Sequence, residues 1–139
     1  MALRVGALPM DPGHRQLQTR ARHHPPMARL TLRIEFGPER AIGPGKVRLL
    51  ELIDEHRSIA AAGRAMKMSY RRAWLLVDSL NHCFKSAVVK AQHGGRAGGG
   101  AALTEFGRSL VAHYRGMEEE AERATRKRLK ALQAGLRAS

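Results

Sequence analysis

The sequence has no long apolar run and almost no cysteine. No stretch approaches the roughly 18 apolar residues of a membrane-spanning helix, and the apolar N-terminus is too short and too proline-broken for a secretory signal. We therefore expect a cytoplasmic location. The single cysteine, Cys83, can form no internal disulfide, and no set of cysteines and histidines has zinc-finger spacing. We interpret Cys83 as a small apolar residue near a helix end.

The sequence also lacks the marks of an enzyme and is poor in acidic residues. No paired carboxylates, nucleophile motif or metal-ligand spacing occurs in the patterned part, so we expect no catalytic residue, no metal and no cofactor. Lysine and arginine number 25 against 12 aspartate and glutamate, a formal net charge of +13. Such a charge favours a polyanionic partner, either nucleic acid or an anionic membrane, and charge alone does not distinguish them.

The chain divides into an unpatterned beginning and one patterned domain. Residues 1–29 contain five arginines, one aspartate and four prolines without an apolar period, which predicts a disordered basic extension. Met27 directly precedes the first patterned segment, so two interpretations stay open: residues 1–26 are a functional arm, or translation starts at Met27. We expect residues 30–134 to form a single folded domain and residues 135–139 a tail.

The patterned part begins with a strand and a helix. Apolar and polar residues alternate over residues 30–36, which predicts a half-buried strand ending at Gly37-Pro38. A helix of about eleven residues is expected after the turn Gly43-Pro44-Gly45. Its core face carries Leu49, Leu50 and Ile53.

Two short helices that meet at a tight corner come next. Ser58 can cap the first, and the small residues between Ala60 and Ala65 allow another helix to approach closely. Lys67 and Met68 form the corner, and Ser69 can cap the second helix. We call this second helix the reading helix.

The reading helix has a predicted buried stripe and an outward face. The stripe consists of Ala73, Leu76, Val77 and Leu80. Arg71, Arg72 and Leu75 then point outward, with Tyr70 and Trp74 at the border. We interpret Trp74 as a core anchor that fixes the reading helix, because its ring buries a large area.

A hairpin and a long helix complete the domain. Residues 87–91 and 101–103 have strand character around a glycine-rich basic tip, and we call the hairpin of residues 87–103 the wing. The strand before the first helix is expected to join it as a third strand. Thr104 caps a final helix to about Leu132, whose apolar residues follow a 4,3 spacing typical of a coiled-coil seam. That seam contains Leu110, Tyr114, Met117, Ala121 and Ala124.

This order of elements predicts a mainly α fold with a small antiparallel sheet, a winged helix-turn-helix followed by a long dimerisation helix. A reading helix that enters the major groove brings its first turns to the base edges. Arg71 and Arg72 match guanine or phosphate, and Ser69 and Tyr70 suit phosphates. In the wing, Gly94 and Gly95 allow close approach to a sugar-phosphate edge, where Arg96 supplies a cation.

One set of motifs resembles a known family. The segments SIAAAGRAMKMSYRRAW, NHC and GGRAGGGAALTEFG resemble the DNA-binding domain of ModE-type molybdate-responsive transcription regulators, which is similar to the LysR-type reading head. The likeness covers residues 30–132. The motifs are specific as a set, although each of them alone would be weak evidence. The resemblance implies a homodimer joined through the first and last helices, with two reading helices about 34 Å apart on a palindromic operator.

Two departures from the family pattern bear on these expectations. Lys67 stands at the corner where the family usually has glycine, so a left-handed backbone there would cost about 1 kcal/mol. Family members continue from the long helix into oxyanion-binding domains, and we expect none in the 139 residues of this sequence, so the resemblance assigns no molybdate site to them. Three alternatives follow: the protein binds DNA constitutively, its regulation no longer depends on molybdenum, or a separate oxyanion-sensing protein supplies the signal.

Three functions stay open from the sequence. The first is a homodimeric, sequence-specific regulator of transcription that binds double-stranded DNA and no membrane. The second is a winged-helix adaptor that pairs with an acidic partner or a separate sensor protein. The third is a nonspecific nucleoid-associated protein, because a small chain of charge +13 binds any duplex.

Overall fold

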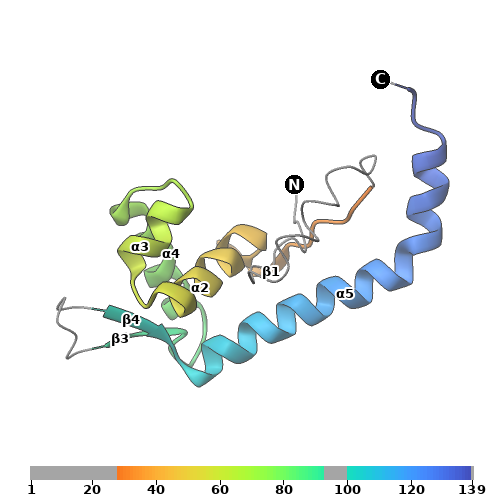
Figure 1. The fold of residues 1–139 in the computed structure, drawn as a ribbon. Coiled ribbons are helices and arrows are strands. Elements are labelled where there is room, and N and C mark those ends of the chain that lie inside the picture. Colours follow the sequence, from red (N-terminus) through yellow and green to blue (C-terminus); the bar gives the residue numbers. More distant parts are fainter. Residues whose placement is uncertain (1–27, 93–99, 139) are drawn as a thin grey trace. The chain divides into compact units, whose positions relative to one another are not determined.

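A computed structural model describes residues 28–92 and 100–138 of the chain, and Figure 1 shows the order of the elements. The described elements are β1 (Ile34–Gly37), β2 (Arg40–Ile42), α2 (Pro44–His56), α3 (Ile59–Ala65), α4 (Tyr70–Cys83), β3 (Val89–Gln92), β4 (Gly100–Leu103) and α5 (Glu105–Ala134). The chain forms two compact units. One is Ile34–Arg115, and the described part of the other comprises residues 28–33 and 116–138.

The fold class agrees with the prediction from sequence. Within the described residues the protein has four helices and two small antiparallel strand pairs, consistent with a winged helix followed by a long C-terminal helix. No helix in this part of the chain is long and apolar enough to cross a membrane. Residues 1–27 of the expected basic extension, which was predicted for residues 1–29, and the wing tip with Gly94, Gly95 and Arg96 lie outside the described residues.

Helix α2 supplies the largest share of the core of the unit Ile34–Arg115. Val47, Leu49, Leu50 and Ile53 are fully buried on it. The helix begins at Pro44 and so is longer than the expected eleven residues. Proline is favoured at the first helical position, because its fixed φ suits the helix and that position needs no N–H donor.

The corner between α3 and α4 is built by local backbone bonds. Ser58 caps α3 by accepting a hydrogen bond from the Ala61 amide at 3.0 Å. At the other end of α3, the Lys67 amide donates to the Arg64 carbonyl at 2.9 Å and the Met68 amide donates to the Gly63 carbonyl at 2.9 Å. These two bonds form a Schellman motif, which requires a left-handed residue after the helix. Lys67 has φ 61°, so the corner has the usual shape and a lysine takes the glycine position.

The small residues of α3 allow a close helix crossing, as predicted. A Cβ atom added at Gly63 would lie 3.0 Å from the Cβ atom of Ala73 on α4. Ala62, Gly63 and Ala73 are buried at this crossing. The short side chains therefore fix how near α4 comes to its support.

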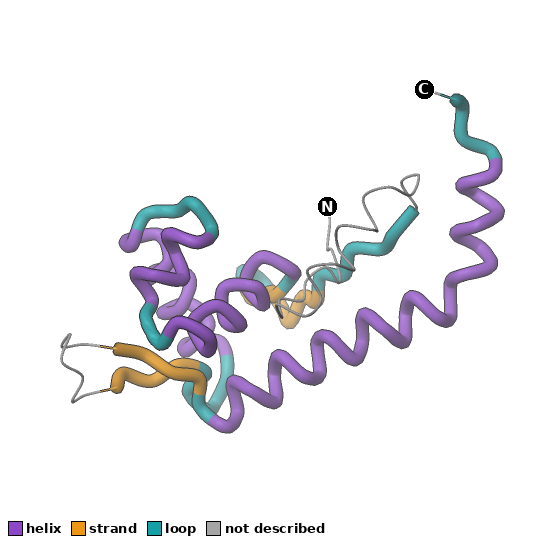
Figure 2. Tube along the Cα trace, in the orientation of Figure 1, coloured by secondary structure: helices purple, strands orange, loops and turns teal. Residues whose placement is uncertain are grey.

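The strand before the first helix, β1, does not join the wing as a third strand, so that prediction was wrong. β1 begins at Ile34 and pairs with β2, whereas β3 pairs with β4 (Figure 2). The turn between β1 and β2 is only two residues long, and pairing such close neighbours has a small loop-closure cost. Beside β4, the Ala101 amide instead donates to the Arg57 carbonyl at 3.1 Å, so the α2–α3 connection occupies that place.

The wing strands are tied to the start of α5 by Thr104 and Gly107. β3 and β4 pair from Val89 with Leu103 to Gln92 with Gly100. Thr104 caps α5 by accepting from the Gly107 amide at 2.9 Å, and its hydroxyl donates to the Ala87 carbonyl at 2.6 Å. A Cβ atom added at Gly107 would lie 2.2 Å from the Val88 carbonyl oxygen. Only glycine therefore lets the start of α5 pack against the chain before β3.

Candidate nucleic-acid interface

The first turn of α4 is fixed by the cap at Ser69 and by a buried apolar stripe. The Ser69 hydroxyl accepts a hydrogen bond from the Arg72 amide at 3.1 Å, and the Ser69 carbonyl accepts one from the Ala73 amide at 3.0 Å. Ala73, Val77 and Leu80 form the buried stripe, and Leu76 is half-buried. The cap and the stripe together fix the direction in which the remaining side chains of the helix project.

The exposed residues of the first two turns include Arg71, Arg72 and Leu75 on the side opposite the stripe, and Tyr70 at the border. Tyr70 is 56% exposed and Leu75 is 47% exposed, and Arg71 and Arg72 are also exposed. Arg71 and Arg72 thus have the outward orientation that the helical spacing predicted. The two guanidinium groups and the isobutyl group of Leu75 stand on one surface, which we call the α4 face, and the phenol of Tyr70 lies at its edge.

The segment that carries the α4 face contains cations and no acid. From Arg57 to Val77 the chain has five basic residues and neither aspartate nor glutamate. All five are exposed: Arg57, Arg64, Lys67, Arg71 and Arg72. The sequence prediction chose only the last two, although the uninterrupted lack of acidic residues over 21 positions also marks Arg64 and Lys67.

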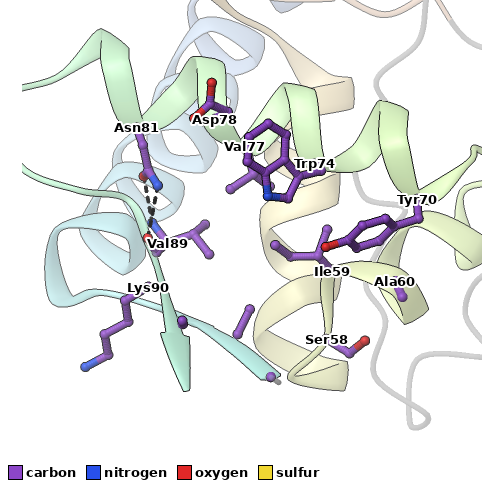
Figure 3. A pocket seen from close by; sticks show the side chains of 13 residues that line it. Ser58, Ile59, Ala60, Tyr70, Trp74, Val77, Asp78, Asn81, Val89 and Lys90 are labelled. Carbon is purple, nitrogen blue, oxygen red and sulfur yellow. Dashed lines mark hydrogen bonds between the residues drawn. The ribbon is translucent and has the colours of Figure 1, made fainter. Parts of the chain in front are cut away.

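A cleft lies beside the α4 face, between α4, the start of α3 and the wing strands (Figure 3). Its volume is about 350 Å³, and Tyr70 and Trp74 line it from neighbouring turns of α4. Trp74 is 44% exposed, so its interpretation as a core anchor was wrong. Small side chains such as Ala73 and Gly63 already fill the α3–α4 contact, and the indole projects over the cleft instead.

Asn81 connects α4 to the wing and was not recognised as a structural residue from its sequence position. Its side-chain oxygen accepts hydrogen bonds from the amides of Val88 at 2.7 Å and Val89 at 3.0 Å. Its side-chain nitrogen donates to the Val89 carbonyl at 3.1 Å (Figure 3). These bonds hold β3 against the C-terminal end of α4, and Lys90 of that strand lines the cleft.

The residues predicted for a dimer seam on α5 differ in exposure. Leu110 is 8% exposed and Tyr114 is fully buried, both within the unit Ile34–Arg115. Met117 is 41% exposed, Ala121 is half-buried and Ala124 is exposed. Leu110 and Tyr114 therefore contribute to the protomer itself, and the other three remain available to a partner.

Other reactive groups in the described residues are few and dispersed. No group of three or more histidine, cysteine, aspartate or glutamate residues in this part of the chain is placed to hold a metal ion. Cys83 is a free, half-buried thiol at the end of α4. The Glu51 carboxylate forms a two-bond ion pair with Arg115, at 2.9 Å for each bond, which joins α2 to α5.

Comparison with known proteins gives relatives of one kind, although no family model matches the chain. The molybdenum transport protein ModE of Azotobacter vinelandii is 38% identical over 98 residues, which are 70% of this chain and 36% of the relative. The molybdenum-pterin-binding protein MopA of Rhodobacter capsulatus is 41% identical over 90 residues, 65% of this chain and 33% of the relative. These similarities support the predicted resemblance of the chain to the ModE family.

A third relative has a name that states a molecular role. The DNA-binding transcriptional dual regulator ModE of Escherichia coli is 29% identical over 87 residues, 63% of this chain and 33% of the relative. The chain spans about a third of the length of these curated relatives. The names of the three relatives describe a transport protein, a molybdenum-pterin-binding protein and a DNA-binding transcriptional regulator.

Proposed function

We propose that the protein is a transcription regulator that binds double-stranded DNA in a sequence-specific manner. The α4 face carries this proposal, because it presents two arginines and a tyrosine on a capped, well-supported helix end. The absence of acidic residues from Arg57 to Val77 gives this surface the positive potential that a phosphate backbone attracts.

Each residue of the proposed site has a chemical role toward DNA. Arg71 and Arg72 bind base edges or phosphates, since the guanidinium group is a planar fork of donors that matches guanine O6 and N7. The Ser69 hydroxyl oxygen accepts from the Arg72 amide, and its O–H donates to a phosphate in this proposal. Tyr70 donates to a neighbouring phosphate. In the wing, Gly94, Gly95 and Arg96 meet a sugar-phosphate edge.

The active form in this proposal is a homodimer. Its seam uses the exposed part of α5, with Met117, Ala121 and Ala124, rather than the buried Leu110 and Tyr114. Two reading helices related by a two-fold axis would meet successive major grooves, about 34 Å apart, on a palindromic operator.

A link to molybdenum is part of the proposal. It rests on the names of the relatives, which include molybdenum transport and molybdenum-pterin-binding proteins. The aligned region is about a third of those relatives, so the proposal concerns which genes are regulated and assigns no molybdate site to the described residues. A separate oxyanion-sensing protein is the alternative source of the signal.

The decisive test removes the two arginines of the α4 face. We expect Arg71→Ala with Arg72→Ala to abolish the preference for a selected operator over random duplex in a gel-shift assay. A good base contact discriminates by about 1–3 kcal/mol, so the preference should fall by roughly tenfold or more. The matched control is Arg123→Ala with Arg126→Ala on α5, which removes the same charge from exposed positions. Far-UV circular dichroism should stay native for both variants.

The same assay separates the other two functions. If the variant without Arg71 and Arg72 prefers the operator over random duplex as strongly as the control variant does, the α4 face is not the reading surface. The affinity of a protein adaptor for its protein partner would depend little on salt concentration. The affinity for DNA should instead fall with salt, and a plot of log binding constant against log salt concentration should have a slope near −0.9 per neutralised phosphate. A nonspecific DNA-coating protein would show almost no preference among genomic fragments.

A further inference from the structure

Leu75 points directly away from the core of its unit. Residues advance about 100° around an α-helix, which places Leu75 roughly 170° from the centre of the buried stripe of Ala73, Val77 and Leu80. Its side chain is 47% exposed. Among the exposed residues of the first two turns of α4, Leu75 therefore lies nearest the middle of the outward side.

The two arginines flank Leu75. By the same geometry Arg71 lies about 40° to one side of it, and Arg72 lies about 60° to the other. Leu75 also lies about 6 Å further along the helix axis than Arg71, since each residue adds about 1.5 Å. A partner that is contacted by both arginines must therefore come close to the Leu75 side chain as well.

The surroundings of Leu75 indicate what kind of partner it fits. Its neighbours one turn away on the outward side are Arg71, Arg72, Asp78 and Ser79, which are all polar. The centre of a protein–protein interface is enriched in arginine but depleted of aspartate and serine, so Asp78 and Ser79 do not match it. A base edge in the major groove offers hydrogen-bond acceptors for the arginines, and thymine alone among the bases adds a methyl group there.

We propose that Leu75 determines specificity by contacting the 5-methyl group of a thymine in the operator. The inference rests on the proposed function, because it requires α4 to lie in the major groove. Successive bases are about 3.4 Å apart on one strand, so the thymine lies within about two base pairs of the base contacted by Arg71. Leu75 in this position selects thymine over cytosine, and the arginines select guanine.

The test removes only the methyl group. The full chain is used to select a preferred duplex from a random pool, and each thymine of that duplex is then replaced in turn by deoxyuridine. At one thymine we expect the dissociation constant of the wild-type protein to rise about fourfold, which corresponds to about 0.8 kcal/mol for one buried methyl group. Leu75→Ala should bind the thymine and deoxyuridine duplexes equally well. Ser79→Ala, at an exposed position one turn away, should keep the wild-type response.

Each outcome decides between the two levels of the proposal. If the wild-type protein selects a sequence but no deoxyuridine replacement weakens its binding, the contact of Leu75 with thymine is refuted and the proposed function stands. The same conclusion follows if Leu75→Ala keeps the full response to the methyl group. If the wild-type protein selects no sequence from the pool, the proposed function itself fails. The wild-type measurements alone can refute the contact, whatever the stability of the Leu75 variant.

Discussion

Replacing Asn81 by alanine should detach the wing from the end of the reading helix and destabilise the protein by about 3 kcal/mol. The Asn81 side chain makes three hydrogen bonds to the backbone of Val88 and Val89, two as acceptor and one as donor. Val88 is fully buried and Val89 is 5% exposed, so water does not readily replace the lost acceptor. Each buried donor left without a partner costs about 1–3 kcal/mol, and the substitution leaves two amide groups in that state.

Urea denaturation followed by far-UV circular dichroism measures the effect. With a slope of about 1.5 kcal/mol per molar urea, a loss of about 3 kcal/mol lowers the midpoint by about 2 M. All variants are compared at one protein concentration, because the stability of a dimer depends on concentration. Asn81→Asp keeps the acceptor for both amides and loses only the donor, so it should cost less than alanine. Ser79→Ala, at an exposed position of the same helix, should change stability by less than about 0.5 kcal/mol.

The result that refutes this reasoning is specific. If Asn81→Ala and Ser79→Ala unfold at the same urea concentration, the three hydrogen bonds do not stabilise the fold. If Asn81→Asp is as damaging as alanine, the acceptor oxygen is not the important atom. Either result would leave the attachment of β3 to α4 without its proposed cause.

Two further predictions concern backbone positions. Gly107→Ala should destabilise the protein by several kcal/mol, because a Cβ atom there meets the Val88 carbonyl oxygen. Gly116→Ala in the same helix has open space for the Cβ atom and should stabilise the protein by about 0.5–1 kcal/mol. Equal shifts of the melting temperature for the two variants would contradict the packing at Gly107. Lys67→Gly should stabilise by about 1 kcal/mol, because the residue is left-handed, while Lys67→Ala removes the same side chain and keeps the strain. Equal melting temperatures for the two Lys67 variants would show that the backbone is not strained.

Part of the fold was predictable from the sequence because it depends on residues that are close in the chain. Ser58, Ser69 and Thr104 each cap a helix by accepting from an amide three residues later, and that relation is set by the local spacing alone. The outward direction of Arg71 and Arg72 likewise follows from the helical period once the apolar stripe is recognised. The candidate site residues on α4 were therefore found without coordinates.

Only the tertiary structure decided the features that depend on distant partners. The alternation of residues 30–36 indicates a strand and does not say whether β2 or the wing lies beside it. Trp74 is exposed because the α3–α4 crossing is already filled by small residues, and Leu110 and Tyr114 are buried by their own protomer. The sequence by itself determined where the three capped helices begin, because each cap bonds an amide three residues later. It also determined which side of α4 faces outward, because the helical period places the apolar stripe on the other side. Strand partners, the role of Asn81 and the need for glycine at position 107 required the fold, since each depends on backbone atoms brought near from elsewhere in the chain.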